Sequence, residues 1–99
     1  MRLYSYGLTE MCEARIPLRF WIDGERTAYC GETLGIAPGH LIVKSPAELV
    51  DGMRLTLRLQ MALDADGSAP AELELFAWVL CASQLPNGNF GAQLELERG

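Results

Sequence analysis

The chain has 99 residues, a formal net charge of -5 and a hydrophobic content of 49%. This length suits one domain and is too short for two, and the hydrophobic content excludes a disordered chain. Proteins that bind nucleic acids rely largely on Lys and Arg at phosphate groups. The acidic balance therefore argues against DNA or RNA as a partner, and we expect a single folded domain.

The cysteines and the first residues indicate where the protein works. Cys12, Cys30 and Cys81 are odd in number and form no CxxC pair, so we expect buried, reduced thiols of a cytoplasmic protein. His40 is the only histidine, which leaves no recognisable metal-ligand set. The opening stretch, MRLYSYGLTEM, lacks the apolar core and cleavage motif of a signal peptide. We predict a cytoplasmic location, no membrane insertion, no metal and no cofactor.

Residues 1–14 are predicted to form an arm that precedes the domain. Tyr4, Tyr6 and Leu8 alternate as in a short strand. Thr9 fits equally well as the N-cap of one helical turn, and both alternatives stay open.

The clearest pattern in the chain is the alternation over residues 53–63, MRLTLRLQMAL. Every odd position is apolar, and the first four even positions are Arg54, Thr56, Arg58 and Gln60. Successive side chains of a strand point to opposite faces of a sheet. A helix would instead bring Leu55 and Arg58 onto the same face. The pattern predicts a half-buried strand of an antiparallel sheet.

Similar patterns separated by turn signals predict five more strands, over residues 15–23, 26–34, 40–44, 72–83 and 90–97. Asp23-Gly24 and Pro86-Asn87-Gly88-Asn89 are hairpin signals, and Gly35 is expected to interrupt the second strand. Ser45 and Glu48 flank a proline as in a capping box, which predicts a short helical turn near 46–50. Together these elements predict an all-β fold, a small six-stranded antiparallel barrel over residues 15–97.

The strand at 72–83 is apolar on both faces, which sets it apart from the others. Leu73 to Cys81 continue the inward face at odd positions, whereas Phe76, Trp78 and Leu80 make the outward face apolar. Such a face needs a cover. The arm with Tyr4 and Tyr6, a partner protein and a second copy of the chain are the alternatives. With Trp21, these three residues are the predicted interaction surface.

The remaining polar residues give no sign of catalysis. With one histidine and no GxSxG motif, paired carboxylates at strand ends are better explained by solubility than by acid–base chemistry. The outward arginines Arg15, Arg19, Arg54 and Arg58 form either a basic patch or the solvated face of two strands, and we favour the second explanation. We do not expect an enzyme.

The order of these features resembles a PilZ domain over about residues 11–96. The resemblance rests on RIPL at 15–18, a GxxxGxxI-like break and restart at 35–42, SPAELVDGMRLTLRL, AWV at 77–79 and NFGAQLEL at 89–96. It implies a PilZ-like barrel in a bacterial signalling protein, because domains of this family commonly act as receptors for cyclic di-GMP.

The two ligand motifs of the family are mostly lost in this chain. In the RxxxR motif, Arg15 is the second arginine and Met11 replaces the first. In the (D/N)xSxxG motif, Gly39 is the final glycine, while Leu34 and Ile36 replace the acidic residue and the serine. Each lost charged hydrogen bond costs about 1.5–3 kcal/mol, so three losses remove several decades of affinity.

We therefore predict a non-catalytic regulatory module that acts through protein–protein contact or self-association. The alternative is a functional receptor that binds cyclic di-GMP through Arg15, Arg19 and Gly39, since Arg15 and Arg19 form a literal RxxxR motif. A generic barrel that binds single-stranded nucleic acid is disfavoured by the acidic charge.

Overall fold

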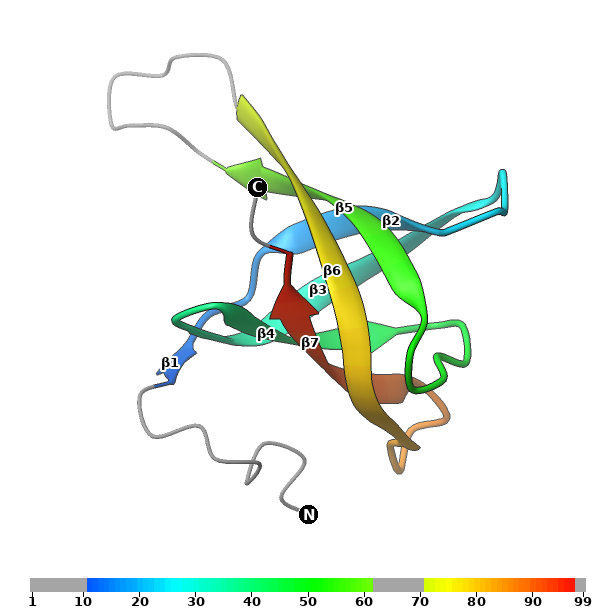
Figure 1. The fold of residues 1–99 in the computed structure, drawn as a ribbon. Coiled ribbons are helices and arrows are strands. Elements are labelled where there is room, and N and C mark those ends of the chain that lie inside the picture. Colours follow the sequence, from blue (N-terminus) through cyan, green and yellow to red (C-terminus); the bar gives the residue numbers. More distant parts are fainter. Residues whose placement is uncertain (1–10, 62–70, 98–99) are drawn as a thin grey trace.

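The computed structural model describes residues 11–61 and 71–97. These residues form seven strands, drawn in Figure 1: β1 (Cys12–Glu13), β2 (Pro17–Ile22), β3 (Ala28–Ala37), β4 (His40–Ser45), β5 (Arg54–Met61), β6 (Ala71–Gln84) and β7 (Phe90–Leu96). None of the described residues forms a helix that could span a membrane.

The strands make one antiparallel sheet that closes on itself. The strand order is β1-β3-β2-β5-β6-β7-β4, and an additional β3–β4 pairing joins the two sides. Figure 1 shows the strands wrapped around a common centre. β2 to β7 thus form a six-stranded barrel, and β1 adds a two-residue pairing to the end of β3. The predicted all-β, six-stranded antiparallel barrel is confirmed.

The barrel core follows the predicted alternation. On β5, Leu55, Leu57 and Leu59 are buried, whereas Arg58 between them is exposed. The inward residues of the other strands join them in one cluster that includes Phe20 and Leu94. Burying a side chain of this size stabilises a fold by about 1.5–3 kcal/mol. The core therefore accounts for why these strands assemble.

β3 is longer than the sequence predicted, because Gly35 does not interrupt it. The strand continues to Ala37 through an irregularity between Thr33 and Gly35, where a bulge bends a strand without ending its pairing. A Cβ atom at Gly31 would lie 2.3 Å from the Lys44 carbonyl oxygen. Glycine there permits β3 and β4 to approach closely enough to close the barrel.

The prediction of a helical turn near residues 46–50 is wrong. Residues 46–47 form a bend, and 48–50 have no regular structure. The Ser45 hydroxyl accepts a hydrogen bond from the Ala47 N–H (3.0 Å) and donates one to the Ala47 carbonyl (2.6 Å). Both hydrogen bonds of the Ser45 hydroxyl are thus made with Ala47, two residues along the chain. Such local bonds compete with the capping of a helix.

Two burial predictions are also wrong. Cys12 and Cys30 are exposed and Cys81 is half-buried, all three as free thiols. The alternation over residues 90–97 predicts an outward Gln93, yet this residue is fully buried, and neither its Nε2 nor its Oε1 has a hydrogen-bond partner among the described residues. It lies opposite Ile42, which is also fully buried. Alternation gives the face on which a side chain lies, not whether that face is covered.

The predictions for residues 1–10, including a strand through Tyr4 and Tyr6 or a helical turn capped by Thr9, lie outside the described residues. The end of the predicted strand at Leu63 lies outside them as well.

The core assignment predicts that Leu57→Ala is far more damaging than the same substitution at Leu73. Leu57 is fully buried, whereas Leu73 is 45% exposed on the same barrel. We expect Leu57→Ala to lower the free energy of unfolding by about 2–5 kcal/mol and Leu73→Ala by less than about 1 kcal/mol. Urea denaturation measures both, and equal losses would contradict the assigned core.

Candidate functional site

A cleft lies at the place where the linker before β2 approaches β3, β4 and the β6–β7 turn. It has a volume of about 330 Å³ and is lined by Arg15, Leu34, Lys44, Leu85, Pro86 and Asn87. Two of these residues, Arg15 and Leu34, occupy family motif positions. Of the three predicted ligand residues Arg15, Arg19 and Gly39, only Arg15 lines this cleft.

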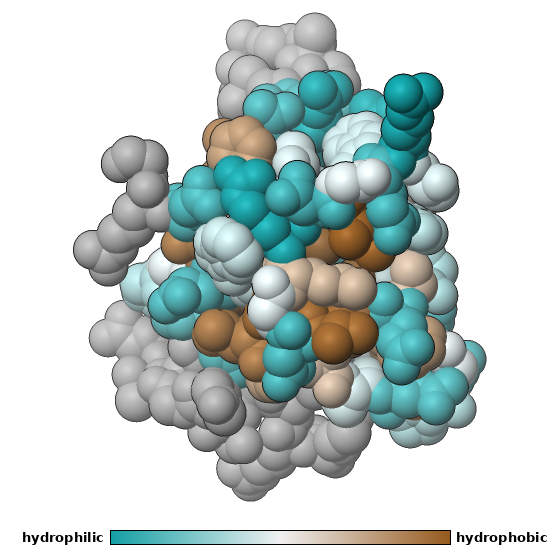
Figure 2. All heavy atoms as spheres, turned by 45° about the vertical axis from the view of Figure 1, so that its right-hand side comes forward, coloured by the Kyte–Doolittle hydropathy of each residue, from teal (hydrophilic) through white to brown (hydrophobic). Residues whose placement is uncertain are grey.

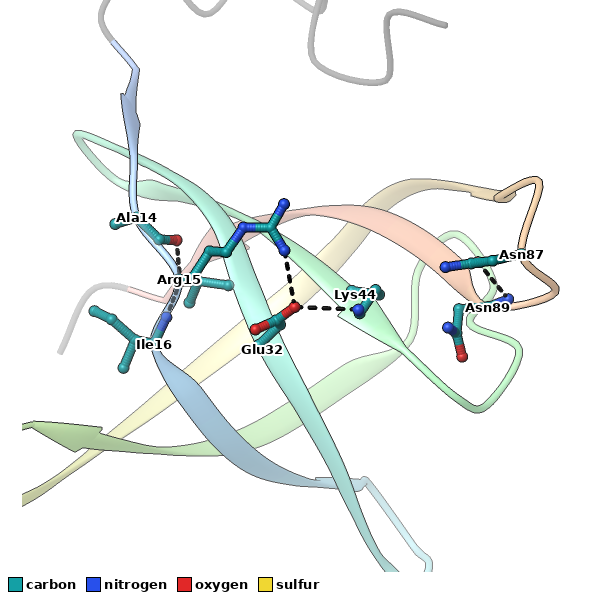
Figure 3. Close-up of polar contacts among 8 residues, drawn as sticks. Ala14, Arg15, Ile16, Glu32, Lys44, Asn87 and Asn89 are labelled. Carbon is teal, nitrogen blue, oxygen red and sulfur yellow. Dashed lines mark hydrogen bonds and ion pairs between the residues drawn. The ribbon is translucent and has the colours of Figure 1, made fainter.

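Thr33 fixes the linker that carries Arg15. This residue is fully buried, and its hydroxyl accepts a hydrogen bond from the Ile16 N–H (2.8 Å) and donates one to the Ala14 carbonyl. Figure 3 shows both bonds on either side of Arg15. Since the backbone is held before and after Arg15, its side chain starts from a fixed point beside β3.

Glu32 neutralises much of the positive charge of the cleft. Its Oε1 lies 3.1 Å from Arg15 Nη1 and 3.1 Å from Lys44 Nζ, and Figure 3 shows both cations directed toward this one carboxylate. The hydrogen bond from Lys44 and the charges of Lys44 and Arg15 lower the pKa of Glu32. Two cations share one anion, so the group retains a single formal positive charge.

The other predicted ligand positions lie elsewhere. Gly39 lies in the β3–β4 turn with a φ of +73° and does not line the cleft. Arg19 forms a salt bridge with Glu72 (3.0 Å) and lies near Trp21. Ile36 packs against the barrel core. The structure thus does not join Arg15 and Arg19 into one clamp.

Met11, which replaces the first family arginine, lies against the backbone of β3. A Cβ atom at Gly35 would be 2.5 Å from Met11 Sδ. This position supplies an apolar contact on β3 where the family motif supplies a hydrogen-bond donor.

A second group of residues gathers on the outward side of β2, β5 and β6. The register places Trp21 opposite Thr56 and Thr56 opposite Phe76, and Trp78 lies opposite Arg54. Phe76 and Trp78 are 38% and 42% exposed. The outward residues Trp21, Phe76 and Trp78, with Arg19, Arg54 and Arg58, are called the aromatic face below.

Leu80, the fourth member of the predicted interaction surface, is placed differently. It falls at an irregularity between Val79 and Cys81, where β6 and β7 shift register, and it is half-buried. The structure therefore joins Trp21, Phe76 and Trp78 but leaves Leu80 at a bulge.

Arginines stack on the rings of the aromatic face. The Arg54 guanidinium carbon lies 4.9 Å from the centroid of Phe76, and that of Arg58 lies 5.2 Å from the Trp21 ring. Such cation–π contacts contribute about 0.5–1 kcal/mol at exposed sites. The rings are thus partly covered in the free protein.

Glu97 holds the Arg54 side chain in place over the face. Its carboxylate accepts hydrogen bonds from Arg54 Nε (2.9 Å) and Nη2 (3.0 Å) and from Trp78 Nε1 (3.1 Å). The Arg54 hydrogen bond lowers the pKa of Glu97, and Glu97 in turn raises the pKa of Arg54. The bidentate geometry fixes the orientation of the guanidinium.

Sequence reasoning missed Glu32, Thr33 and Lys44. Their roles depend on the register that places Glu32 opposite Lys44 across β3 and β4. The only signal was that Glu32 and Lys44 are charged residues in two predicted neighbouring strands. Without the register, nothing pairs them with Arg15.

The described strands define a closed antiparallel barrel of the PilZ type with one short extra strand. Among solved structures, the chain matches the Bacillus subtilis Inhibitor of motility (MotI/DgrA) with a TM-score of 0.67 and 14% sequence identity. The match covers 89% of this chain and 41% of that one, so this chain spans less than half the length of that protein. This match confirms the predicted PilZ-like fold, and it concerns the fold alone.

A scan against models of protein families finds no match, and neither does a sequence comparison with curated proteins.

The lowered pKa of Glu32 predicts a pH dependence of stability. A depressed folded-state pKa stabilises the fold above the ordinary value of 4.5, and this contribution is lost as the pH falls through the folded-state pKa. We expect the free energy of unfolding to fall less steeply below pH 4.5 in Glu32→Gln than in the unaltered protein. Urea denaturation at several pH values measures the slopes.

Glu48→Gln is the matched control for this measurement, because it removes an exposed carboxylate that forms no salt bridge with the described residues. An equal flattening of the slope in Glu48→Gln would show that the effect does not come from the Glu32 ion pairs.

Proposed function

We propose that this chain is a PilZ-like regulatory module that acts by binding another protein through its aromatic face. The observation that carries the proposal is the exposure of Phe76 and Trp78 on the outer face of the barrel, in register with Trp21. Aromatic side chains, above all Trp and Tyr, and arginines are enriched at the centres of protein interfaces. The similarity in fold to an inhibitor of motility supports a regulatory role by analogy.

The composition of the cleft supports the view that the family ligand is no longer the main partner. Glu32 already forms salt bridges with both Arg15 and Lys44. A ligand phosphate would have to compete with this carboxylate or lie beside it. Leu34 lines the same cleft and offers no acceptor for a guanine N–H. Both features lower the affinity for a dinucleotide.

Binding of cyclic di-GMP remains the second candidate, and one observation favours it. The Arg15 side chain is 64% exposed and lies with Lys44 on the wall of a cleft of about 330 Å³. Both candidates are non-catalytic functions of a bacterial cytoplasmic protein, as the resemblance to PilZ domains implies.

A calorimetric titration with cyclic di-GMP separates the two candidates. We expect no micromolar binding, because three family contacts are missing and Glu32 competes for the remaining cations. An NMR titration of the labelled chain gives the location of any binding. Micromolar affinity with shifts at Arg15 and Gly39 would overturn the proposal in favour of the receptor.

Glu32→Gln sharpens the same titration. The substitution keeps the side-chain shape and raises the charge of the cleft by one, so Arg15 and Lys44 become available to an anion. If Glu32 is the main obstacle, we expect the variant to bind more tightly than the unaltered protein by about tenfold, the equivalent of about 1.4 kcal/mol. No gain would place the obstacle at Met11, Leu34 and Ile36 instead.

Trp78→Glu tests the aromatic face directly. Trp78 is outward and 42% exposed, so we expect the variant to fold, with a loss of stability below about 1.5 kcal/mol from the hydrogen bond between its indole and Glu97. We expect it to lose the protein complexes that the unaltered chain forms, measured by size-exclusion chromatography of cell extracts.

Val50→Glu is the matched control, since Val50 is 53% exposed and lies outside the aromatic face. If Trp78→Glu folds and keeps the same hydrodynamic size and partners, the interface is wrongly assigned.

A further inference from the structure

The charged residues of the aromatic face indicate the chemistry of its partner. Each of its three arginines forms a salt bridge with a carboxylate of β6 or of the segment after β7: Arg19 with Glu72 (3.0 Å), Arg58 with Glu74 (3.1 Å) and Arg54 with Glu97 (2.9 Å). These pairs are neutral as units. The arginines therefore do not make the face a site for anions.

Further carboxylates border the face but are not bound in its three salt bridges. Glu95 lies opposite Trp78 in the β6–β7 register, so the two side chains point to the same side of the sheet. Asp23 and Glu25 lie beyond Trp21, at the turn after β2. Within residues 11–61 and 71–97, none of these three forms a salt bridge.

The balance of charge on the face is therefore negative. The three arginines of the face and Arg26, which directly follows Glu25, stand against six carboxylates, which leaves a formal charge of -2. The six are Asp23, Glu25, Glu72, Glu74, Glu95 and Glu97. Since complementary potentials set the choice of partner at protein interfaces, a partner for this face carries positive charge.

A cavity beside Trp21 is suited to a cationic side chain. It has a volume of about 200 Å³ and is lined by Trp21, Thr56 and Arg58 together with Asp23, Gly24 and Glu25. Two carboxylates and an indole ring are groups that attract Lys and Arg. The Glu25 carboxylate accepts a hydrogen bond from the Tyr29 hydroxyl (3.1 Å), which holds it beside this cavity.

The distribution of hydrophobic residues points to a mixed partner rather than an apolar one. Figure 2 shows one side of the molecule, on which a band of hydrophobic residues across the lower middle is interrupted and bordered by hydrophilic residues. On the aromatic face, Phe76 and Trp78 likewise lie among charged side chains. A partner that matches this pattern presents apolar and basic side chains in alternation.

A second copy of the chain fits this face poorly. A two-fold contact brings the same patch of both copies together, which would place a charge of -2 against an equal charge. Each of the three arginines of the face is also already paired with a carboxylate of its own chain.

We propose that the aromatic face binds a short basic segment of a partner protein, with apolar side chains of that segment on Phe76 and Trp78 and a Lys or Arg in the cavity beside Trp21. This inference rests on the proposed function and adds the chemistry of the partner. The arginines are held by carboxylates before binding, so the face loses little conformational freedom when the segment docks.

Selection from a library of short random peptides on the full chain tests the proposal. Trp78→Ser serves for counter-selection because it removes the ring without a change in charge, and circular dichroism verifies that it folds. Phe76→Ser provides a second variant of the face. We expect the peptides that depend on Trp78 to be rich in Lys and Arg and to contain at least one large apolar residue.

A matched pair of charge variants then separates local from general attraction. We expect Asp23→Asn/Glu25→Gln to weaken the selected peptides by about three- to tenfold. Glu13→Gln/Glu48→Gln removes the same charge from exposed positions outside the face and is expected to change the affinity by less than about twofold. Equal losses in both variants would overturn the proposal.

The remaining outcomes distinguish this inference from the proposed function. Trp78-dependent peptides without an excess of Lys and Arg would overturn the basic partner but leave the interface intact. A complete absence of Trp78-dependent peptides would count against both. Self-association of the chain that is lost in Trp78→Ser, measured by sedimentation velocity, would replace the basic segment with a second copy.

Discussion

Closure of the barrel between β3 and β4 is the constraint on which the candidate sites depend. β3 pairs with β2 through its first half and with β4 through its second half, and it bends between Thr33 and Gly35. This pairing sets the register in which Glu32 lies opposite Lys44. The buried hydroxyl of Thr33 then holds the linker with Arg15 beside the same strand. The cleft is thus a consequence of how the barrel closes.

The cleft and the aromatic face balance charge in different ways, and this difference separates the ligands that we propose for them. In the cleft, the Glu32 carboxylate pairs with both Arg15 and Lys44, and the three side chains together keep a positive charge. On the aromatic face, each arginine has its own carboxylate, and further carboxylates leave the face negative. The two candidate ligands, an anion in the cleft and a basic peptide on the aromatic face, would therefore bind at separate places on this barrel.

The sequence predicted the barrel well because alternation reports directly on burial. Leu55, Leu57 and Leu59 lie inside and Phe76 and Trp78 outside, as the period of two required. The site was predicted less completely. Glu32 and Lys44 lie opposite each other through a strand register that the sequence pattern does not contain. Arg15 and Arg19 lie apart because Arg15 is in the linker before β2 and Arg19 is on β2 itself. Ser45 satisfied its hydroxyl locally, so its capping motif produced no helix.

Arginine side chains cover part of the apolar outward face of β6 and of Trp21 beside it. Exposed aromatic rings favour association with other surfaces, yet Arg54 stacks on Phe76 and Arg58 stacks on Trp21. Glu97 and Glu74 hold these guanidinium groups in place. The cover is therefore polar on its outer side and apolar toward the rings. A basic segment that binds the carboxylates need not displace it, so the same arginines can protect the rings in the free protein and extend the contact surface in a complex.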